Sequence, residues 1–315
     1  MESVGFVYRQ FTLHFELARE TVFDVFPTFV IRSILGKELR SLACIFKGRQ
    51  CDECGLVKHC PVSILFETPL SKDEAFMRGL NRGAHPFVFW TEVGLGQKVR
   101  SFPLFLTIIG CLDEAFPFIY GALLRGSRGG ILRERIPYEI VGVESDGVVI
   151  GTKMDTLDMK TLSGAKCFTL SLQQDVRRYR QYRIVLSTPL RLKHEGRYMN
   201  RLDPGAFLAS IQRRLWQLSA LYGEAKTLPR VESHPSWQIR DINVRWQDLS
   251  HYSARQKRLI KLGGLVGDFV LEGEFSPYEE GLLEAATLFH AGKNVAFGLG
   301  RVEMREKTLA EEEGR

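Results

Sequence analysis

The pattern of hydrophobic and polar positions divides the chain into two similar series of elements. In the first half, apolar residues at helical spacing predict a helix over residues 28–42 and a shorter one over residues 117–124. Runs rich in β-branched and aromatic residues predict strands, and the turn Ser145-Asp146-Gly147 predicts a hairpin between the last two of them. These expected strands cover residues 4–17, 62–67, 86–93, 102–111, 138–143 and 148–151.

The second half repeats this order. A helix is predicted over residues 204–222, because Asp203 is a good N-cap and Pro204 suits the first helical position. A second helix is expected over residues 278–291. Expected strands cover residues 183–187, 237–246, 265–274 and 296–304.

Each half therefore has approximately the order strand, helix, strand, strand, helix, strand, which is typical of the ferredoxin-like split βαβ motif. In each half the second helix runs into a turn rich in glycine and arginine, at residues 126–133 and 292–301. We predict an α+β protein with two tandem ferredoxin-like (RRM-like) domains. The expected domains are residues 1–165, with a cysteine-rich insertion at about 44–60, and residues 176–305, followed by an acidic tail at 306–315, and the link is expected at about 155–178.

Composition and charge narrow the class of partner. The 315 residues are 44% hydrophobic and 25% charged, which suits a folded protein, and the formal net charge is +6 despite the acidic tail. An excess of cations favours a polyanionic partner, although a basic protein without a nucleic-acid role remains the alternative. Apolar runs are too short to span a bilayer and no secretory signal is visible, so we expect a soluble, cytoplasmic protein that does not bind membranes.

The segment H-A-G-K-N-V-A-F-G-L-G-R-V-E-M at residues 290–304 is the most distinctive pattern. It follows an expected helix and precedes an expected strand, which is the reverse of a dinucleotide-binding fingerprint, and it lacks the Gly-Lys-Ser/Thr ending of an NTP-binding loop. Its glycines either allow only tight turns and close packing or expose amides that bind phosphate oxygens. Lys293 and Arg301 bracket the loop and could neutralise a phosphate.

Together with other segments, this loop resembles the C-terminal region of CRISPR-associated endoribonucleases that process precursor crRNA, members of the RAMP superfamily. The similar segments are Y-S-A-R-Q at 252–256, L-G-G-L-V-G at 262–267, H-A-G-K at 290–293 and F-G-L-G-R at 297–301. The segment T-P-L-R-L-K at 188–193 is similar to the strand that opens the family's second domain. Residues 31–39 are similar to its first helix, and residues 126–133 to its first glycine turn.

The resemblance implies metal-independent cleavage of CRISPR repeat RNA. The 2′-hydroxyl beside the scissile phosphate attacks it, leaving a 2′,3′-cyclic phosphate, while a general base takes the proton and a cation stabilises the phosphorane. The implied partners are repeat RNA or crRNA and CRISPR effector subunits, with the chain as a monomer or homodimer. A non-catalytic RAMP-type RNA-binding subunit is the alternative function, and an unrelated zinc-stabilised basic protein is the third.

Candidate catalytic residues follow from the same resemblance. The family often places a catalytic histidine on or beside its first helix, but this chain has none between residues 22 and 42. Lys37 on that helix, His59 in the cysteine segment and His290 before the glycine loop are the candidates, each with a structural or solvated role as its alternative. No metal is expected for catalysis. The candidate RNA-binding residues are Gly292, Lys293, Gly298, Gly300, Arg301, Arg125, Arg128, Arg133, Arg32, Arg178 and Arg180.

Four of the six cysteines form a local cluster with the spacing C-x6-C-x2-C-x5-C. Two thiolates two residues apart can bind one tetrahedral metal, and the outer pair could complete a closed four-sulfur site. We therefore predict a structural Zn²⁺ site, with His59 as a substitute ligand and with an iron–sulfur cluster, free thiols or an oxidised pair as alternatives. The predicted ligands are Cys44, Cys51, Cys54 and Cys60.

Overall fold

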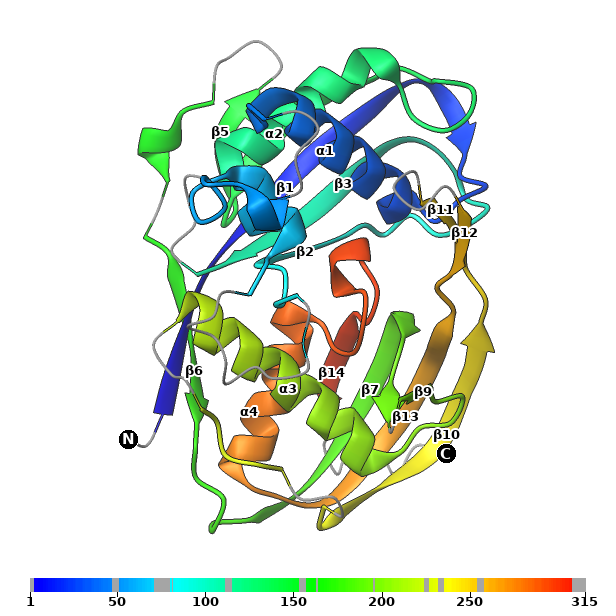
Figure 1. The fold of residues 1–315 in the computed structure, drawn as a ribbon. Coiled ribbons are helices and arrows are strands. Elements are labelled where there is room, and N and C mark those ends of the chain that lie inside the picture. Colours follow the sequence, from blue (N-terminus) through cyan, green and yellow to red (C-terminus); the bar gives the residue numbers. More distant parts are fainter. Residues whose placement is uncertain are drawn as a thin grey trace. The chain divides into compact units, whose positions relative to one another are not determined.

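The computed structural model divides the chain into two compact units (Figure 1). Val7–Lys166 form the N-terminal unit, and Met1–Phe6 with Cys167–Arg315 form the C-terminal unit. The structure describes residues 3–46, 51–70, 80, 82–110, 115–152, 157–162, 164–194, 196–223, 227–231, 235–253 and 258–307. Most of the expected acidic tail and Cys111 therefore lie outside the described residues.

The N-terminal unit is a ferredoxin-like domain. Its sheet has the order β2-β3-β1-β4-β5, and the pairings of β1 with β3 and with β4 are antiparallel. The first four positions reproduce the ferredoxin-like arrangement, in which the first strand lies between the third and the fourth. The elements are β1 (Ser3–Val22), α1 (Pro27–Ala43), β2 (Phe87–Trp90), β3 (Lys98–Ile109), α2 (Ala115–Gly126), β4 (Tyr138–Ser145) and β5 (Val148–Thr152).

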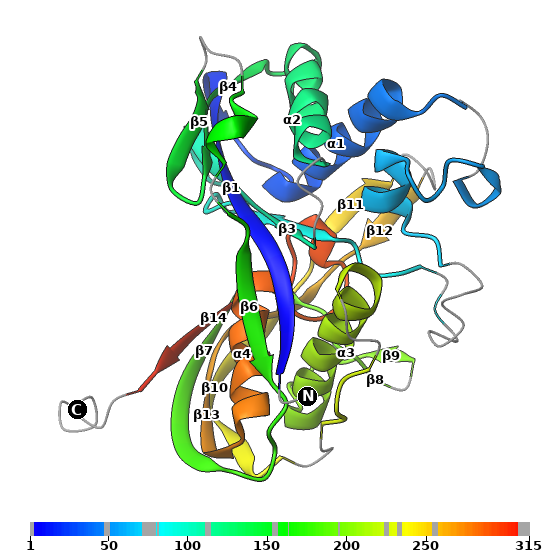
Figure 2. The ribbon, with the colours of Figure 1, turned by 90° about the vertical axis from the view of Figure 1, so that its left-hand side faces the viewer.

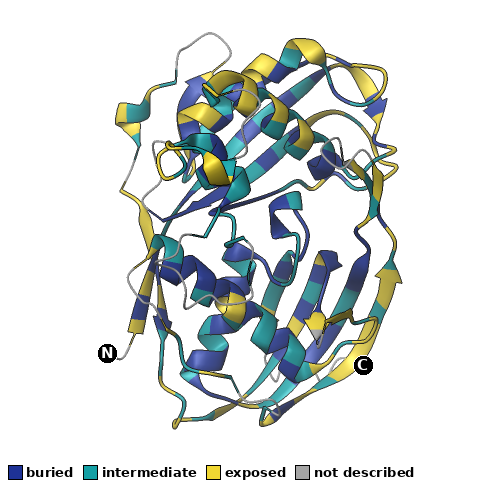
Figure 3. Cartoon of the chain, viewed as in Figure 1, coloured by how far each residue is buried: buried dark blue, intermediate teal, exposed yellow. Residues whose placement is uncertain are grey.

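Helices α1 and α2 lie on the same face of this sheet (Figures 1 and 2). Alternate residues of β1 are buried beneath them, and the ring of Phe11 stacks on that of Phe116 in α2 with centroids 3.7 Å apart. Gly126 allows the two helices to meet, because a β-carbon there would lie 2.3 Å from Ile34 of α1. Buried positions therefore concentrate between the helices and the sheet, as Figure 3 shows in dark blue.

The cysteine segment between α1 and β2 contains two short helical elements. Cys51–Glu53 is a single 3₁₀ turn, and Ser63–Glu67 is a π-helical turn closed by the bond from the Thr68 amide to the Ser63 carbonyl (2.7 Å). The predicted strand over residues 62–67 is therefore wrong. A short apolar run has no periodicity that distinguishes strand from helix, and here i→i+5 bonding satisfies its backbone.

The C-terminal unit repeats the same topology. Its four-stranded sheet has the order β10-β13-β7-β14, again with the first strand of the series between the third and the fourth. Helices α3 and α4 cover one face of it (Figures 1 and 2). The elements are β7 (Arg178–Leu190), α3 (Pro204–Tyr222), β10 (Trp237–Gln247), β13 (Gly264–Phe275), α4 (Pro277–Phe289) and β14 (Val302–Glu306). Two separate hairpins are formed by β8 (Lys193–His194) with β9 (Arg197–Tyr198) and by β11 (Ser250–Ser253) with β12 (Arg258–Lys261).

Local signals fix the helices of this unit. The Asp203 side chain accepts a hydrogen bond from the Ala206 amide (2.7 Å), so the predicted start of α3 is confirmed. Ser276 and Glu279 form a capping box at the start of α4. The final strand is shorter than predicted, because residues 295–297 form a 3₁₀ turn before β14 begins at Val302.

The expected link between the halves contains a strand that the sequence did not predict. Strand β6 (Lys166–Ser171) pairs with β1. In the C-terminal unit, the rings of Phe6, Phe168 and Phe289 lie within 6.2 Å of one another, centroid to centroid, and pack β1 and β6 against α4. Within the described residues, no helix is both long enough and apolar enough to cross a membrane.

The glycine-rich segment before β14 depends on close backbone contact. Gly300 has φ +71°, its carbonyl accepts from the Ala291 amide (2.8 Å), and its amide donates to Pro189 of β7 (3.1 Å). A β-carbon at Gly300 would lie 1.8 Å from the Ala291 carbonyl oxygen. Glycine at this position is therefore required for the loop to close.

We predict that Gly300→Ala lowers the free energy of unfolding by about 2–6 kcal/mol, the combined cost of a left-handed non-glycine residue and of overpacking. Thermal denaturation measures the effect. The control is Gly164→Ala, because a β-carbon there meets nothing within 4 Å. Equal melting temperatures for the two variants would contradict this role of Gly300.

Candidate nucleic-acid interface

The loop at residues 290–301 is fixed to the end of β7 by its main chain. The Lys293 amide donates to the Arg191 carbonyl (3.0 Å), and the Arg301 amide donates to the Thr188 hydroxyl (2.9 Å). Gly292 and Gly298 have φ +80° and +79°, and a β-carbon at Gly292 would lie 2.7 Å from the Arg191 carbonyl oxygen. The glycines therefore allow close packing in this loop. This was one of the two roles that the sequence suggested for them.

His290 lies inside this packing. Its side chain is 2% exposed, and its Nδ1 donates to the Leu299 carbonyl (3.1 Å). Burial, with smaller effects of Arg214 and Arg301, lowers the pKa of His290 to about 3, although the bond to Leu299 opposes this shift. These contacts favour a structural role for His290, in which it helps to close the loop. They do not favour the catalytic role that the sequence suggested.

Lys293 lies in a cluster of cations on the same unit. Burial lowers the pKa of Lys293, and the charges of Arg213 on α3 and Lys193 on β8 lower it further. No carboxylate within the described part of the chain forms an ion pair with any of these three residues. A bound anion would relieve their mutual repulsion, so this cation cluster, defined as Lys193, Arg213 and Lys293, is suited to a phosphate.

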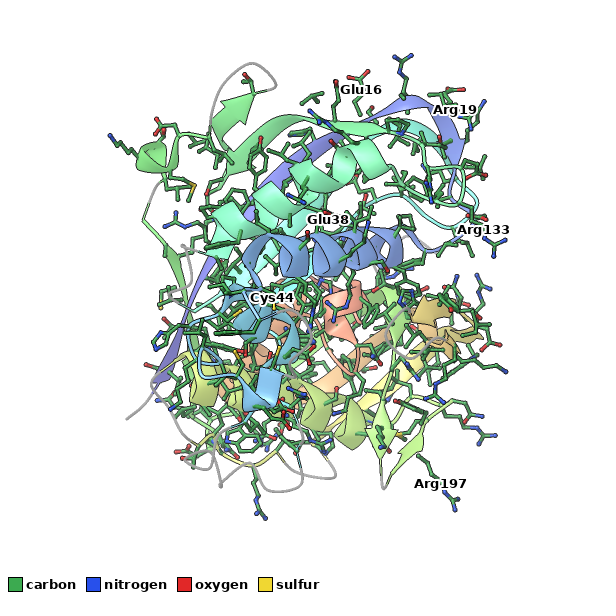
Figure 4. The ribbon with its side chains drawn as sticks, turned by 45° about the horizontal axis from the view of Figure 1, so that its top comes forward. Glu16, Arg19, Glu38, Cys44, Arg133 and Arg197 are labelled. Carbon is green, nitrogen blue, oxygen red and sulfur yellow. The ribbon has the colours of Figure 1, made fainter. Side chains whose placement is uncertain are left out.

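The hairpin of β8 and β9 is connected to the loop through Arg191. The Arg191 side chain donates to the Asn294 side-chain oxygen (3.0 Å), and its guanidinium carbon lies 4.2 Å from the centre of the Tyr198 ring. Arg197 on β9 extends outward (Figure 4). The hairpin therefore adds an exposed cation and a half-exposed aromatic ring to the surface that carries Lys193.

Several of the arginines that the sequence suggested are occupied by other contacts. Arg180 lies 3.4 Å from the carboxylates of both Glu280 and Glu306. Arg214 of α3, which was not a candidate, is also buried and donates to the Phe289 carbonyl (2.6 Å), and burial lowers its pKa to about 9. Arg301 pairs with Glu303 at 2.5 Å, while Arg178 is exposed at the start of β7. Carboxylates therefore hold two of the three candidate arginines of this unit, Arg180 and Arg301.

In the first glycine turn, at residues 126–133 of the N-terminal unit, nearby carboxylates offset part of the positive charge that the sequence indicates. Arg125 donates to Glu38 of α1 (3.2 Å). Arg128 lines a groove of about 540 Å³ together with Arg100, Glu16 and Glu139, so acidic and basic groups balance there. Arg133 is exposed and extends away from the unit (Figure 4).

A histidine that the sequence analysis did not single out lies against α1. His85, just before β2, has its Nε2 3.5 Å from Arg32 of α1 and its Nδ1 3.2 Å from the Thr68 hydroxyl. The Arg32 guanidinium also stacks over the Phe66 ring at 4.6 Å. Burial lowers the pKa of Arg32 to about 10, an effect that Glu67 opposes, so Arg32 remains a cation at neutral pH. Sequence could not reveal this group, because Arg32 and His85 are 53 residues apart.

The other two catalytic candidates of this unit are not part of that group. Lys37 has a side chain that is 80% exposed and pairs with Glu38 (3.0 Å). His59 is exposed, and its main-chain amide donates to Leu56 in a turn (3.0 Å). Neither residue has a contact with His85 or Arg32 among those described.

The four clustered cysteines come together around one small cavity. Cys44, Cys51, Cys54 and Cys60 line it with apolar neighbours, and all four thiols are free. Burial, and then the charge of Glu67, raises the pKa of the Cys51 thiol, while Arg40 opposes this shift. No three potential ligands among the described residues are already arranged around a metal position, so a preformed zinc site is not supported.

Comparison with known proteins finds a matching family model for part of each unit. Residues 184–302 match the family model described as CRISPR-associated endoribonuclease Cas6, and residues 6–159 match a family model described simply as an N-terminal domain. No curated protein matches the sequence.

Solved Cas6 structures share the fold. A Cas6 product complex has a TM-score of 0.53 at 15% identity, covering 95% of this chain and 99% of that one. Thermus thermophilus Cas6 has a TM-score of 0.51 at 14% identity, covering 97% and 100%. A partial Cas6-RT-Cas1–Cas2 complex has a TM-score of 0.54 at 13% identity, covering 96% of this chain and 47% of that one.

Each unit thus has the ferredoxin-like strand order, and in the C-terminal unit a glycine-rich loop precedes the last strand. The Cas6 family match is therefore carried by the C-terminal unit, at residues 184–302, and the chain as a whole shares the fold of solved Cas6 structures.

We predict that His290 makes the protein sensitive to acid. Its pKa of about 3 lies below the 6.5 of an unfolded histidine, so the unfolded state binds more protons between these values and stability falls as the pH decreases through them. The melting temperature of the His290→Asn variant should therefore decrease less between pH 6.5 and 4.5 than that of the unmodified protein. His59→Asn, at an exposed histidine, should behave like the unmodified protein. The same decrease in all three proteins would contradict the prediction.

Proposed function

We propose that this protein is an endoribonuclease that cleaves CRISPR repeat RNA without a metal, with His85 as general base and Arg32 as the cation beside the phosphate. The observation that carries the proposal is the contact of His85 with Arg32 on the helix similar to the first helix of the Cas6 family. The match of residues 184–302 to the endoribonuclease family supports the reaction class.

The hydrogen-bond network supports a base role for His85. The Thr68 hydroxyl donates to the Ile64 carbonyl (3.2 Å), so its oxygen is free to accept from Nδ1–H of His85. With this tautomer Nε2 is the unprotonated nitrogen, as a general base requires, and the 2′-hydroxyl of the RNA would have to replace Arg32 as its hydrogen-bond donor. The separation of 3.5 Å is at the outer limit of a hydrogen bond, as is common before a substrate binds.

In the proposed reaction, Nε2 takes the proton of the 2′-hydroxyl as the oxygen attacks the adjacent phosphorus. The P–O5′ bond breaks, the leaving oxygen takes up a proton, and a 2′,3′-cyclic phosphate remains on the upstream fragment. The Arg32 guanidinium offsets the negative charge that grows on the phosphorane. Its partial burial strengthens this effect, because a less hydrated cation acts through a lower effective dielectric.

The cation cluster is the proposed binding surface for the RNA backbone. Arg213 and Lys193 both repel Lys293 in the absence of an anion, and the β8–β9 hairpin adds Arg197 and Tyr198 for phosphate contact and base stacking. The match of residues 184–302 to a family of endoribonucleases supports RNA as the ligand. The partial complex with RT-Cas1 and Cas2 supports assembly with other CRISPR proteins as a further partner class.

The alternative is an RNA-binding RAMP subunit without nuclease activity. The exposure of Lys37 and His59 and the burial of His290 favour it, because none of the histidines and lysines expected from the sequence is placed as an evident base. The two functions share the RNA-binding surface and differ only at His85 and Arg32.

We predict that His85→Ala reduces the rate of repeat-RNA cleavage by about 10²–10⁴-fold, the usual contribution of a general base, while RNA affinity stays within about threefold. Single-turnover assays in EDTA measure the rate, and filter binding measures the affinity. RNA with a 2′-deoxy substitution at the cut site should not be cleaved. His14→Ala is the matched control, since His14 pairs instead with Glu144 (2.8 Å) on the sheet.

Three results would change this assignment in different ways. Full activity of His85→Ala would exclude it as the base, and cleavage of the 2′-deoxy RNA would exclude the mechanism. Tight binding of repeat RNA without any cleavage by the unmodified protein would establish the RNA-binding subunit instead.

We also predict that each of Lys193→Ala, Arg213→Ala and Lys293→Ala makes the slope of log affinity against log salt concentration less negative by about 1, because each removes one phosphate contact. Titrations between 50 and 200 mM salt measure this slope. Arg240→Ala is the control, because Arg240 is held by Glu272 on β13 (3.0 Å). Slopes unchanged in all three variants would place the RNA elsewhere.

A further inference from the structure

The cysteine-lined cavity has the size of a single-ion site. Its volume is about 20 Å³, close to the space that one water-sized sphere occupies. Cys44, Cys51, Cys54 and Cys60 contribute to its walls, and Val57 and Val62 keep the lining apolar. A single ion fits such a space.

Backbone turns bring the thiols to this cavity. Cys44 is the C-cap of α1 (Figure 4). The Cys54 amide donates to the Cys51 carbonyl (3.2 Å), and this turn brings both cysteines of the C-x2-C pair to the wall of the same cavity. A second turn, from the Cys60 amide to the Leu56 carbonyl (2.9 Å), returns the chain and adds the fourth cysteine.

The surroundings favour sulfur ligands alone. The exposed side chain of His59 does not line the cavity, so it is a poor substitute for a thiolate. The Arg40 guanidinium lies 3.8 Å from the Cys51 sulfur, where it can offset part of the net negative charge of a metal bound by four thiolates.

From this geometry we propose that the four cysteines bind one Zn²⁺ in a closed, tetrahedral, structural site. Binding replaces four S–H protons by the metal without any change of oxidation state, and the protons are released to solvent. The thiols are not yet arranged around a metal position, so we infer that they draw together when the ion binds, as is usual where metal binding completes local folding.

The site would organise the segment that leads to His85. Asp52, between two of the ligands, accepts hydrogen bonds from both terminal nitrogens of Arg82 at 2.8 and 3.0 Å. Arg82 also lies 3.5 Å from Glu67, beside Thr68. Zinc would therefore fix the cysteine segment, which holds Arg82 through Asp52, while His85 three residues further on contacts Arg32 of α1. Its role would be structural and not catalytic.

The test measures metal directly and does not depend on RNA cleavage. We expect the purified, reduced full-length protein to contain one zinc per chain by elemental analysis, and the Cys51→Ser/Cys54→Ser variant to contain none. Cys167→Ser is the matched control and should retain one zinc, because this exposed cysteine lies outside the cluster. Metal-free protein titrated with Co²⁺ should develop the strong visible bands of a tetrahedral thiolate site at one equivalent.

If the double variant does not fold, the number of reactive thiols in the native protein provides a second test. Zinc-loaded native protein should show four fewer reactive thiols than the metal-free protein. A folded protein with no zinc and no cobalt bands would overturn the proposal, as would iron with sulfide in place of zinc. Retention of one zinc by both Cys44→Ser and Cys60→Ser would also overturn it. None of these results would affect the proposed nuclease.

Discussion

An antiparallel sheet with one apolar face is stable only when that face is covered, and in each unit two helices on the same side provide the cover. This constraint decides where the functional segments lie. Because β14 pairs with β7, the chain that leaves α4 must cross the end of β7 before the last strand can begin. The glycine-rich loop is that crossing, which is why its amides meet the carbonyls of Pro189 and Arg191.

Charge is distributed according to the same geometry. On the strands of the C-terminal unit, arginines are paired across the sheet, as Arg183 is with Asp268 (3.0 Å) and Arg240 with Glu272 (3.0 Å). Around the loop and the β8–β9 hairpin, by contrast, cations adjoin cations. The net charge of the chain is therefore a poor guide to its binding surface. An arginine that pairs with a carboxylate on the next strand is largely neutralised and attracts a polyanion only weakly.

The sequence predicted the fold well wherever periodicity was strong. The bounds of α3 were correct at both ends, because a capping aspartate and a proline mark its start and the apolar spacing continues to its end. The π-helical turn at Ser63–Glu67 and the strand β6 were missed, since the first is a short apolar run without a period and the second depends on pairing with distant β1.

The site was less predictable, because its chemistry comes from tertiary contacts. His290 looked available from its place before a glycine loop, but the loop packs over it and leaves it 2% exposed. His85 had no distinguishing neighbours in the sequence and becomes a candidate only through Arg32 and Thr68, which are 53 and 17 residues away. The cysteine spacing, in contrast, is a local signal, and the fold brings its four members to one cavity.

Strand β1 contributes residues to both units. Its first residues belong to the C-terminal unit, where Phe6 completes an aromatic group with Phe168 and Phe289, while the rest of the strand is the centre of the N-terminal sheet. A fragment that begins at Cys167 would therefore leave part of two phenylalanine rings exposed to water, at a cost of about 1.5–3 kcal/mol for the lost burial of Phe6. The second domain is thus not separable by a simple cut between the halves, and an isolated version would need residues 3–6 supplied as an added strand.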